Sequence, residues 1–344
     1  MAKIKLRDLF ELGDYSSPYF VAELNTSHFG KIEIAKKMVD EAKKAGCHCV
    51  KFQSWTEETL YSKTYYRDNP IAKRFVKKFS FSDETLKQLS NYCIERKIGF
   101  ASTPYSIEEA NFLVKECNVP FVKVASMEIN NHEFLKQLGL LKAPIVISTG
   151  MSNMDEIIEA VKIIEDTGNR NISILHCVSI YPVDASYINL NNILGLRRQF
   201  PNYPIGYSDH SIGVEMASAA IALGACLIEK HFTLDNKAIG MDNQMATEPG
   251  EMEILVRNCN NIFQAMGDKE RILSKEEKDQ QIIMRRSIVA NKDLQKGKVL
   301  SLKDFDYKRP GTGFSPANPE LLIGKKLIRN VEADNLITKE DIEQ

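Results

Sequence analysis

Eight short apolar runs recur along the chain, and each ends in polar or ionisable side chains. A stretch with helical spacing follows each run, and successive runs mostly begin about 20 to 30 residues apart, the length of a βα unit. This pattern predicts a (β/α)8 TIM barrel, whose chemistry lies on loops at the carboxyl ends of the strands. The runs are Phe20–Glu23, Cys49–Gln53, Ile98–Thr103, Val119–Ser126, Pro144–Thr149, Ile172–Cys177, Gly206–His210 and Leu227–His231.

The hydrophobic pattern changes after the eighth unit and its closing helix. We expect residues 1–267 to form the barrel and residues 268–284, which are charged with little apolar period, to form a partly helical linker. From Arg285 onward, short β runs alternate with turn signals. Residues 285–344 are therefore predicted to be a small, mainly β domain, and about 60 residues bury so little surface that we expect it to pack on something else.

Two segments lie outside the repeating units. Residues 1–18 hold a few apolar positions before Ser16-Ser17-Pro18, and we expect this lead-in to cover the bottom of the barrel. Residues 54–81 form a long insertion after the second strand, rich in Tyr, Lys, Arg and Phe. Loops of this length are either functional lids or disordered segments, and the sequence leaves both interpretations open.

Composition excludes some partners. The 344 residues include 45 basic and 46 acidic side chains, a net charge of -1, so no overall field favours nucleic acid or an anionic membrane. The apolar runs are too short to cross a bilayer, and the first residues lack an apolar signal-peptide core. We therefore expect a cytoplasmic protein whose seven cysteines are reduced core residues.

Lysines occur inside two of the predicted strands. Lys51 lies in strand two and Lys123 in strand four. A lysine inside a parallel strand is costly unless an anion meets it, and a carboxylate at the barrel rim is the alternative partner. With the hydroxyl groups of Thr103, Ser126 and Ser148, the lysines predict a polar cup for the phosphate and carboxylate oxygens of a small anionic substrate.

Two histidines, His210 and His231, end the seventh and eighth strands. Neighbouring strands are about 4.8 Å apart, so the two imidazoles can share a divalent metal such as Mn²⁺ or Zn²⁺, a Lewis acid for a carbonyl group. Asp209 and Glu229 are candidate hydrogen-bond partners of these histidines. The alternative is a pair of rim histidines that only bond to those carboxylates. Glu23 is a candidate acid or base opposite the metal.

Short motifs carry a family resemblance through nearly the whole chain. The barrel motifs are Ala22-Glu23, Ser27-His28-Phe-Gly30, Val50-Lys-Phe-Gln53, Ser102-Thr-Pro104, Lys123-Val-Ala-Ser126-Met-Glu128, Ile147-Ser-Thr-Gly-Met151, Leu175-His-Cys177, Tyr181-Pro182, Gly206-Tyr-Ser-Asp-His210, Ala222-Leu-Gly-Ala225 and Ile228-Glu-Lys-His-Phe232. Those of the tail are Arg285-Arg-Ser287, Lys292-Asp-Leu-Gln-Lys-Gly297, Lys308-Arg-Pro-Gly311 and Leu322-Ile-Gly-Lys325. The set resembles the sialic acid synthases, including legionaminic and pseudaminic acid synthases, with their C-terminal antifreeze-like (SAF) domain.

The resemblance implies a transferase that condenses phosphoenolpyruvate with the open-chain aldehyde of an N-acylated amino sugar, giving a nonulosonic acid and free phosphate. The sugar would be N-acetylmannosamine or a 2,4-diacetamido-2,4,6-trideoxyhexose. The resemblance also implies a divalent metal cofactor, Mn²⁺ foremost with Mg²⁺ or Co²⁺ as alternatives. It further implies a domain-swapped homodimer in which the SAF domain of one chain caps the barrel of the other.

Roles carry over from the family position by position. His210 and His231 match the metal ligands, and Glu23 matches the acidic residue that serves water addition or proton transfer. Ser179, Tyr181, Asp242 and Arg309 match sugar-binding positions, with Arg309 reaching the partner's site from the SAF domain. The positions matching those that hold phosphoenolpyruvate are Lys51, Gln53, Thr103, Lys123, Ser126, Ser148 and Ser208.

Three positions depart from the family's usual pattern. Ser27 stands where Asn precedes His28, Ser179 replaces a commoner Asn or Thr, and Met241 stands where Gly-Pro-Asp is usual. All three lie where the sugar is expected, so they bear on the identity of the sugar. The Gly240-x-Asp242 and Glu248-Pro249 pattern resembles the sialic and legionaminic branches more than the pseudaminic branch. The alternatives are another metal-dependent barrel aldolase, which would not release phosphate, and a non-catalytic sugar-binding relative.

Overall fold

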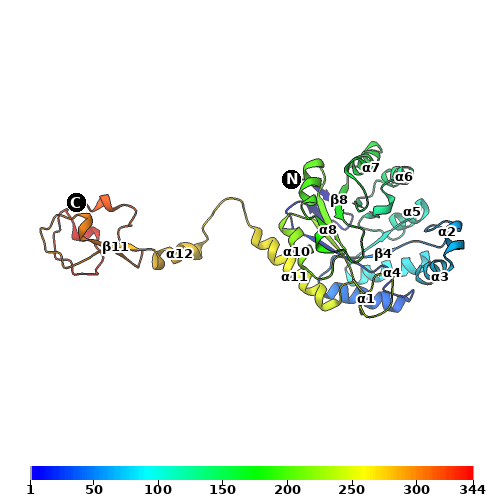
Figure 1. Ribbon diagram of the computed structural model, residues 1–344, viewed down its shortest axis with the longest axis horizontal. Coiled ribbons are helices and arrows are strands. Elements are labelled where there is room, and N and C mark those ends of the chain that lie inside the picture. Colours follow the sequence, from blue (N-terminus) through cyan, green and yellow to red (C-terminus); the bar gives the residue numbers. More distant parts are fainter. Residues whose placement is uncertain (1, 344) are drawn as a thin grey trace. The chain divides into compact units, whose positions relative to one another are not determined.

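A computed structural model describes residues 2–343 of the chain, which divide into two compact units after Gly267. The first unit contains a ring of strands surrounded by helices, and the second is a small unit at the C-terminal end (Figure 1).

Eight parallel strands form the wall of the first unit, which confirms the predicted barrel. They pair in the order β5-β4-β3-β10-β9-β8-β7-β6. The first and last barrel strands, β3 and β10, are thus neighbours, and β5 lies against β6 at the remaining seam. The strands are β3 (Tyr19–Glu23), β4 (Cys49–Gln53), β5 (Gly99–Thr103), β6 (Val122–Val124), β7 (Ile145–Ser148), β8 (Ile172–Cys177), β9 (Ile205–Asp209) and β10 (Leu227–His231).

Helices cover the outer face of this wall (Figure 1). Each buries one apolar stripe, as α1 does with Ala35, Met38 and Val39. Polar caps fix where helices begin: Asn153 and Glu156 bond to each other's backbone N–H groups at the start of α7. The helices are α1 (Ile32–Lys44), α4 (Asp83–Arg96), α5 (Ile107–Lys115), α6 (His132–Leu140), α7 (Met154–Asp166), α8 (Ala185–Ile188), α9 (Asn192–Gln199), α10 (Glu215–Ala222) and α11 (Pro249–Met266).

Every second side chain of each strand faces the barrel interior. These inward-facing side chains form a lower and an upper layer. The lower layer is apolar, and the hairpin of β1 (Lys3–Lys5) and β2 (Glu11–Gly13) packs Ile4 and Leu12 against it. The lead-in therefore closes the bottom of the barrel, as predicted. The upper layer is polar. In the apolar lower layer, the strands contribute Tyr19, Val21, Cys49, Ala101, Val146, Leu175 and Leu227.

The insertion of residues 54–81 folds into two helices, α2 (Lys63–Asp68) and α3 (Pro70–Phe79). Trp55, Tyr66 and Val76 form a small core of its own beside the barrel. The disordered alternative is therefore wrong for this segment.

Residues 268–343 of the second unit form one α-helix and a small antiparallel sheet. Helix α12 (Lys275–Met284) occupies the predicted linker, and the carbonyl of Ile282 accepts a hydrogen bond from Gly311 N at 2.8 Å, which ties this helix to the second unit. Strands β11 (Ser287–Ala290) and β12 (Phe305–Lys308) pair antiparallel. Isolated bridges and the 3-10 turns Leu302–Asp304, Pro319–Leu321 and Lys339–Asp341 complete it. Its core is Ile288, Ala290, Leu294, Leu300, Phe305, Leu322, Leu327, Val331, Ile337 and Ile342.

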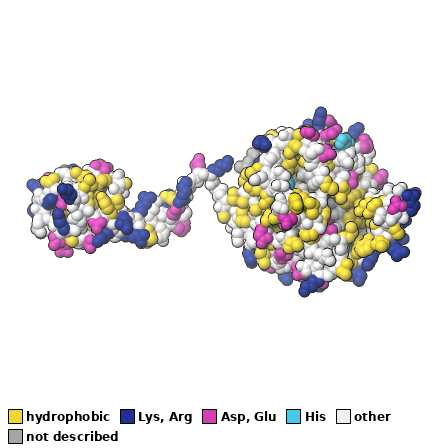
Figure 2. Space-filling view, viewed as in Figure 1, with side chains coloured by type: hydrophobic (Ala, Val, Ile, Leu, Met, Phe, Trp, Pro, Cys, Tyr) yellow, Lys and Arg dark blue, Asp and Glu magenta, His cyan; other side chains and the backbone are white. Residues whose placement is uncertain are grey.

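Surface charge agrees with the balanced composition. Acidic and basic side chains both appear on the face of each unit that Figure 2 shows. None of the helices within residues 2–343 is long and apolar enough to cross a membrane. All seven cysteines are free and buried, as predicted.

Candidate active site

One cavity of about 350 Å³ opens where the eight strands end, a size that suits a small metabolite. Every residue predicted to be catalytic, to bind metal or to bind a substrate lines it, with the exception of Arg309. The predicted residues in its wall are Glu23, Lys51, Gln53, Thr103, Lys123, Ser126, Ser148, Ser179, Tyr181, Ser208, His210, His231 and Asp242.

Strand register brings the main ionisable groups to one level of the barrel. In the pairing of β10 with β3, His231 lies opposite Glu23, and in the pairing of β3 with β4, Glu23 lies opposite Lys51. Gln53 lies opposite Thr103 one step higher, between β4 and β5. Because residues two apart share a face of a strand, all five side chains project into the interior.

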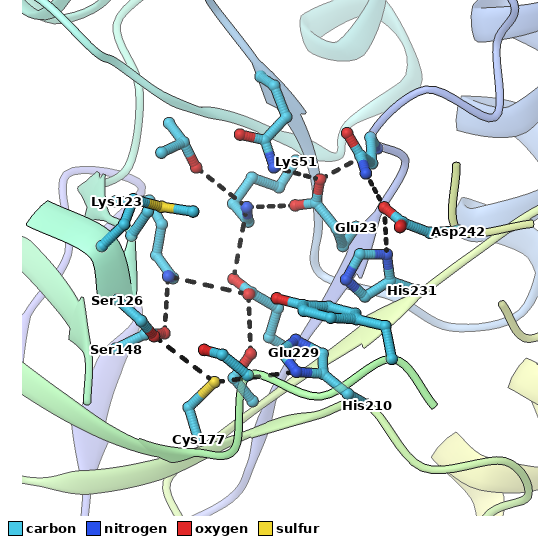
Figure 3. Close-up of a pocket in the computed structure, with 18 of the residues that line it drawn as sticks. Glu23, Lys51, Lys123, Ser126, Ser148, Cys177, His210, Glu229, His231 and Asp242 are labelled. Atoms are coloured by element: carbon cyan, nitrogen blue, oxygen red, sulfur yellow. Dashed lines mark hydrogen bonds and ion pairs between the residues drawn. The ribbon is translucent and has the colours of Figure 1, made fainter. Parts of the chain in front are cut away.

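Two lysines and two glutamates form a buried charge cluster at the base of the cavity (Figure 3). Lys51 forms an ion pair with Glu23, so the carboxylate partner that the sequence left open is present. Glu229 lies between the lysines, 3.8 Å from Lys51 Nζ and 3.9 Å from Lys123 Nζ. Lys123 also donates to Ser148 Oγ at 2.7 Å. The four charges compensate one another, so the cluster can stay buried without a ligand.

The environment separates the two carboxyl groups in pKa. Burial raises the pKa of Glu23 to about 7, against the opposing effect of Lys51. Burial acts in the same direction on Glu229, but Lys123 and Lys51 together hold its pKa below the ordinary value. Burial lowers the pKa of Lys123, whereas Glu229 and Glu23 overcome burial and raise that of Lys51. Glu229 is therefore a fixed anion at neutral pH, while Glu23 can gain or lose a proton.

The rings of His210 and His231 lie side by side on the cavity wall in an edge-to-face arrangement, with centroids 5.3 Å apart. His210 Nδ1 lies 2.7 Å from the carbonyl oxygen of Val178. A carbonyl oxygen only accepts, so Nδ1 carries a proton. Burial lowers the pKa of His210, but Cys177 and the Val178 carbonyl outweigh burial and raise it above the ordinary value, and in the neutral form Nε2 has the lone pair. Burial lowers the pKa of His231 well below the ordinary value and leaves a neutral imidazole. In its neutral form, each ring can offer a lone pair to a cation.

The carboxylate partners expected for these histidines are only partly where the sequence suggested. Asp209 bonds to neither ring: it turns to the outer face of the barrel and accepts from Lys230 Nζ at 2.7 Å, so that prediction is wrong. Glu229 lies at the charge cluster, and Ser208 Oγ donates to it at 3.0 Å. The nearest carboxylate to His231 is instead Asp242, whose Oδ2 lies 3.7 Å from Nδ1.

A second group of contacts forms the mouth of the cavity. Asn25 donates through its side chain to Asp242, and its backbone N–H donates to Glu23 Oε1 at 3.0 Å. The Tyr181 ring lies over His210, with centroids 4.1 Å apart. Asn25, at the strand-one loop where the departure at Ser27 was noted, thus reaches the expected sugar end of the site.

Several residues of the cavity wall escaped the sequence reasoning. Tyr105 donates from its hydroxyl to Gln53 Oε1 at 2.8 Å, and Gln53 Nε2 donates to Glu23 Oε1 at 3.2 Å. Cys177 lies between Ser126 Oγ, at 3.7 Å, and the ring of His210. Tyr105 follows Pro104, which ends strand three, but nothing in the sequence indicated that its side chain turns into the cavity. The others in the wall are Asn25, Trp55, Leu60, Tyr61, Ala125, Met127 and Met151, beside Glu229 and Met241, which the sequence had singled out.

Arg309 belongs to the second unit, at the residue after β12, and is exposed there. Its contact with a sugar stays a prediction. Within residues 2–343, no group of three or more His, Cys, Asp or Glu has the arrangement of a complete metal site.

Comparison with known proteins places this chain among nonulosonic acid synthases. Residues 38–271 match the NeuB family and residues 285–343 match the SAF domain. The N,N'-diacetyllegionaminic acid synthase of Campylobacter jejuni is 36% identical over 328 residues, 92% of this chain and 98% of that protein. The N-acetylneuraminate-9-phosphate synthase of Drosophila melanogaster is 34% identical over 365 residues, 96% of this chain and 98% of that protein.

A solved structure gives the same assignment. The N-acetylneuraminic acid (sialic acid) synthetase of Leptospira borgpetersenii superposes with a TM-score of 0.75 at 31% identity, covering 81% of this chain and 94% of that one. Family matches, full-length relatives and fold agree: the chain belongs to the NeuB family of sialic, legionaminic and pseudaminic acid synthases and carries the SAF domain at its C-terminal end.

Proposed function

We propose that this protein condenses phosphoenolpyruvate with the open-chain aldehyde of an N-acylated amino sugar and releases phosphate. The observation that carries the proposal is the buried cluster of Lys51, Lys123, Glu23 and Glu229 directly beside the histidine pair. A cation-lined cup next to two imidazoles suits a small trianion and a carbonyl partner together.

The lysines and hydroxyl groups are the binding site we propose for phosphoenolpyruvate. Lys51 donates to Thr103 Oγ1 at 3.1 Å and Lys123 to Ser148 Oγ at 2.7 Å, so each ammonium group already lies beside a hydroxyl that can donate to the same anion. Phosphate and carboxylate oxygens of the substrate would take over part of the charge compensation that Glu23 and Glu229 supply. The site thereby exchanges one set of ion pairs for another instead of leaving lysines unpaired.

The donor set fits a divalent metal, with Mn²⁺ as our first choice. His210 and His231 would hold the ion through imidazole lone pairs, and Glu229 Oε2, which is buried without a hydrogen-bond partner, is a further oxygen on the same wall. Such an ion supplies Lewis acidity to the sugar aldehyde.

The chain's own residues would manage the bonds and protons. C3 of phosphoenolpyruvate attacks the aldehyde carbon, water adds at C2, and the C2–O bond to phosphate then breaks. One proton of that water ends on the new sugar hydroxyl and the other leaves with phosphate. Glu23, with a pKa of about 7, is the group we propose to accept the proton of the attacking water and pass it on. Lys51 and Lys123 stabilise the phosphate as it leaves.

The mouth of the cavity is the proposed sugar site. Tyr181 and Asp242 lie beside the histidines there, and Ser179 lines the same wall. A second copy of the chain would supply Arg309 from its SAF domain in a domain-swapped homodimer, where a planar guanidinium suits the acylamino group.

Phosphate release tests this proposal directly. The protein would be incubated with phosphoenolpyruvate and either N-acetylmannosamine or a 2,4-diacetamido-2,4,6-trideoxyhexose, with Mn²⁺ or with EDTA. His210→Ala should abolish release, whereas His132→Ala, which changes an exposed histidine on α6, should leave it unchanged. Metal-dependent release with one sugar supports the reaction. Consumption of phosphoenolpyruvate with phosphate retained in the product would indicate an aldolase. No turnover in folded, metal-loaded protein would refute the proposal.

A further inference from the structure

An ion pair lies buried on the outer face of the two strands that carry the histidines. Lys230 Nζ is 2.7 Å from Asp209 Oδ2, and their side chains are only 1% and 0% exposed. The two residues lie directly opposite each other in the pairing of β10 with β9. The outer face of a barrel strand usually packs apolar side chains against helices, so a buried charge pair is unusual at this place.

The hydrogen bonds of this pair converge on Ser211, the residue after His210. Asp209 Oδ1 accepts from Ser211 N at 2.8 Å, from Ser211 Oγ at 2.7 Å and from the Tyr207 hydroxyl at 3.1 Å. Lys230 makes a second bond to the carbonyl oxygen of Ser211 at 2.6 Å. Asp209 and Ser211, which flank His210, are therefore both hydrogen-bonded to Lys230, the residue before His231.

We propose that the Asp209–Lys230 pair is a positioning element that sets the separation of His210 and His231 for their metal. The inference rests on the proposed function, because it assumes that the two histidines bind the ion. The backbone of His210 is fixed on both sides by the pair, and its ring is fixed by the bond from Nδ1 to Val178 O. Neither Asp209 nor Lys230 lines the cavity, so neither would touch the ion or a substrate.

Stability alone does not account for this arrangement. Apolar residues of similar volume commonly replace a buried ion pair at no cost to folding, whereas removal of one partner leaves an unpaired buried charge. Within the residues that the structure describes, the pair lies at the only strand junction that carries two candidate ligands, and this location points to a requirement for geometry. Groups that orient metal ligands typically contribute about 10- to 100-fold to metal affinity.

The test uses the double variant Asp209→Asn/Lys230→Met in the full chain. The asparagine can still accept from Ser211, so the turn is kept while the link between β9 and β10 is lost. No buried charge is left alone, so we expect the variant to fold. The control is Asp14→Asn/Arg197→Met, which removes a pair at the other end of β9: Arg197 Nε lies 3.1 Å from Asp14 Oδ2, and Asp14 Oδ1 accepts from Ile205 N at 2.9 Å.

The readout is Mn²⁺ binding followed by electron paramagnetic resonance, with and without phosphoenolpyruvate, in proteins whose circular dichroism matches the wild type. We expect the Kd of the double variant to rise about 10- to 100-fold and that of the control to stay unchanged. An unchanged Kd in the folded double variant would overturn the proposal. Should the double variant not fold, Ser211→Ala decides, since it removes one bond to Asp209 and should weaken binding by about two- to tenfold; unchanged binding there also overturns it.

Failure of the proposed function gives a different result. If wild-type protein shows no saturable Mn²⁺ binding, or if His231→Ala binds as wild type does, the metal site itself is refuted and the positioning role falls with it. Normal binding that depends on His231 but not on the pair refutes the positioning role alone.

Discussion

Substituting Glu23 by glutamine tests the proposed mechanism most directly, because the substitution removes the carboxylate charge and keeps the size and shape of the side chain. Asn25 N and Gln53 Nε2 both donate to Glu23 Oε1, at 3.0 and 3.2 Å, and an amide oxygen can accept both bonds. What Glu23→Gln loses is the ability to take a proton and the charge facing Lys51. Lys51 keeps Glu229, 3.8 Å away, as a second anionic partner.

The magnitude follows from the raised pKa of Glu23, about 7 in the folded chain. About one tenth of the carboxyl groups are ionised at pH 6 and about nine tenths at pH 8. The pH dependence of kcat/KM reports the free protein, so an ionised base at this position should make kcat/KM rise about tenfold over that interval. The glutamine variant should lack this rise, and its kcat should be lower by about 10²- to 10⁴-fold.

The assay is phosphate release over pH 5.5 to 9 at saturating sugar and metal. Phosphoenolpyruvate and the metal ligands titrate too, but equally for both proteins, so the ratio of wild-type to variant kcat/KM isolates Glu23. The reasoning is refuted if that ratio is the same at every pH.

Stability provides an independent check of the same pKa. Burial raises the pKa of Glu23 from 4.5 to about 7, so the folded chain holds a proton that the unfolded chain has lost between these values. The contribution of Glu23 to stability is therefore fully present below pH 4.5 and is lost as pH rises to about 7. Relative to the wild type, Glu23→Gln should be more stable at pH 8 than at pH 5 in urea unfolding, and an unchanged difference would contradict the assigned shift.

Other changes probe the rest of the site. Lys123→Met should raise the KM for phosphoenolpyruvate about 10- to 100-fold, because a bond to a charged group is lost, and should leave the KM for the sugar unchanged. The surface control Lys162→Met should change neither KM, and an equal rise in both KM values of Lys123→Met would contradict the assignment. Tyr105→Phe frees the Gln53 amide to turn its oxygen toward Glu23, so the pKa of Glu23 should rise and the pH profile of kcat/KM should shift to higher pH. The control Tyr92→Phe loses a hydroxyl outside the site, bonded to Asp40 at 2.8 Å, and its profile should not shift. EDTA should abolish phosphate release and Mn²⁺ restore it; undiminished release from protein shown to be metal-free would rule out the metal.

The polar upper layer of the barrel was predictable because strand ends in a parallel barrel meet at one face. Lys51, Lys123, His210 and His231 each ended an apolar run or lay inside one, and period-two alternation placed them on the inner side. Tyr105 was not predictable, since its hydroxyl reaches Gln53 only through the chain direction after Pro104. The sequence also could not show which side chains of the polar cup form ion pairs and hydrogen bonds with one another.

The sequence by itself determined the number and order of the strands, the helices that cover them and the end of the barrel where polar groups gather, because these depend on local periodicity and on the rule that parallel strands end together. Only the tertiary structure decided that Glu229 lies between two lysines and that Asp209 pairs with Lys230. Both depend on the register between β9, β10 and their neighbours, where a shift of one residue would exchange the inner and outer faces. Register is set by packing across the whole barrel, and no short stretch of sequence contains it.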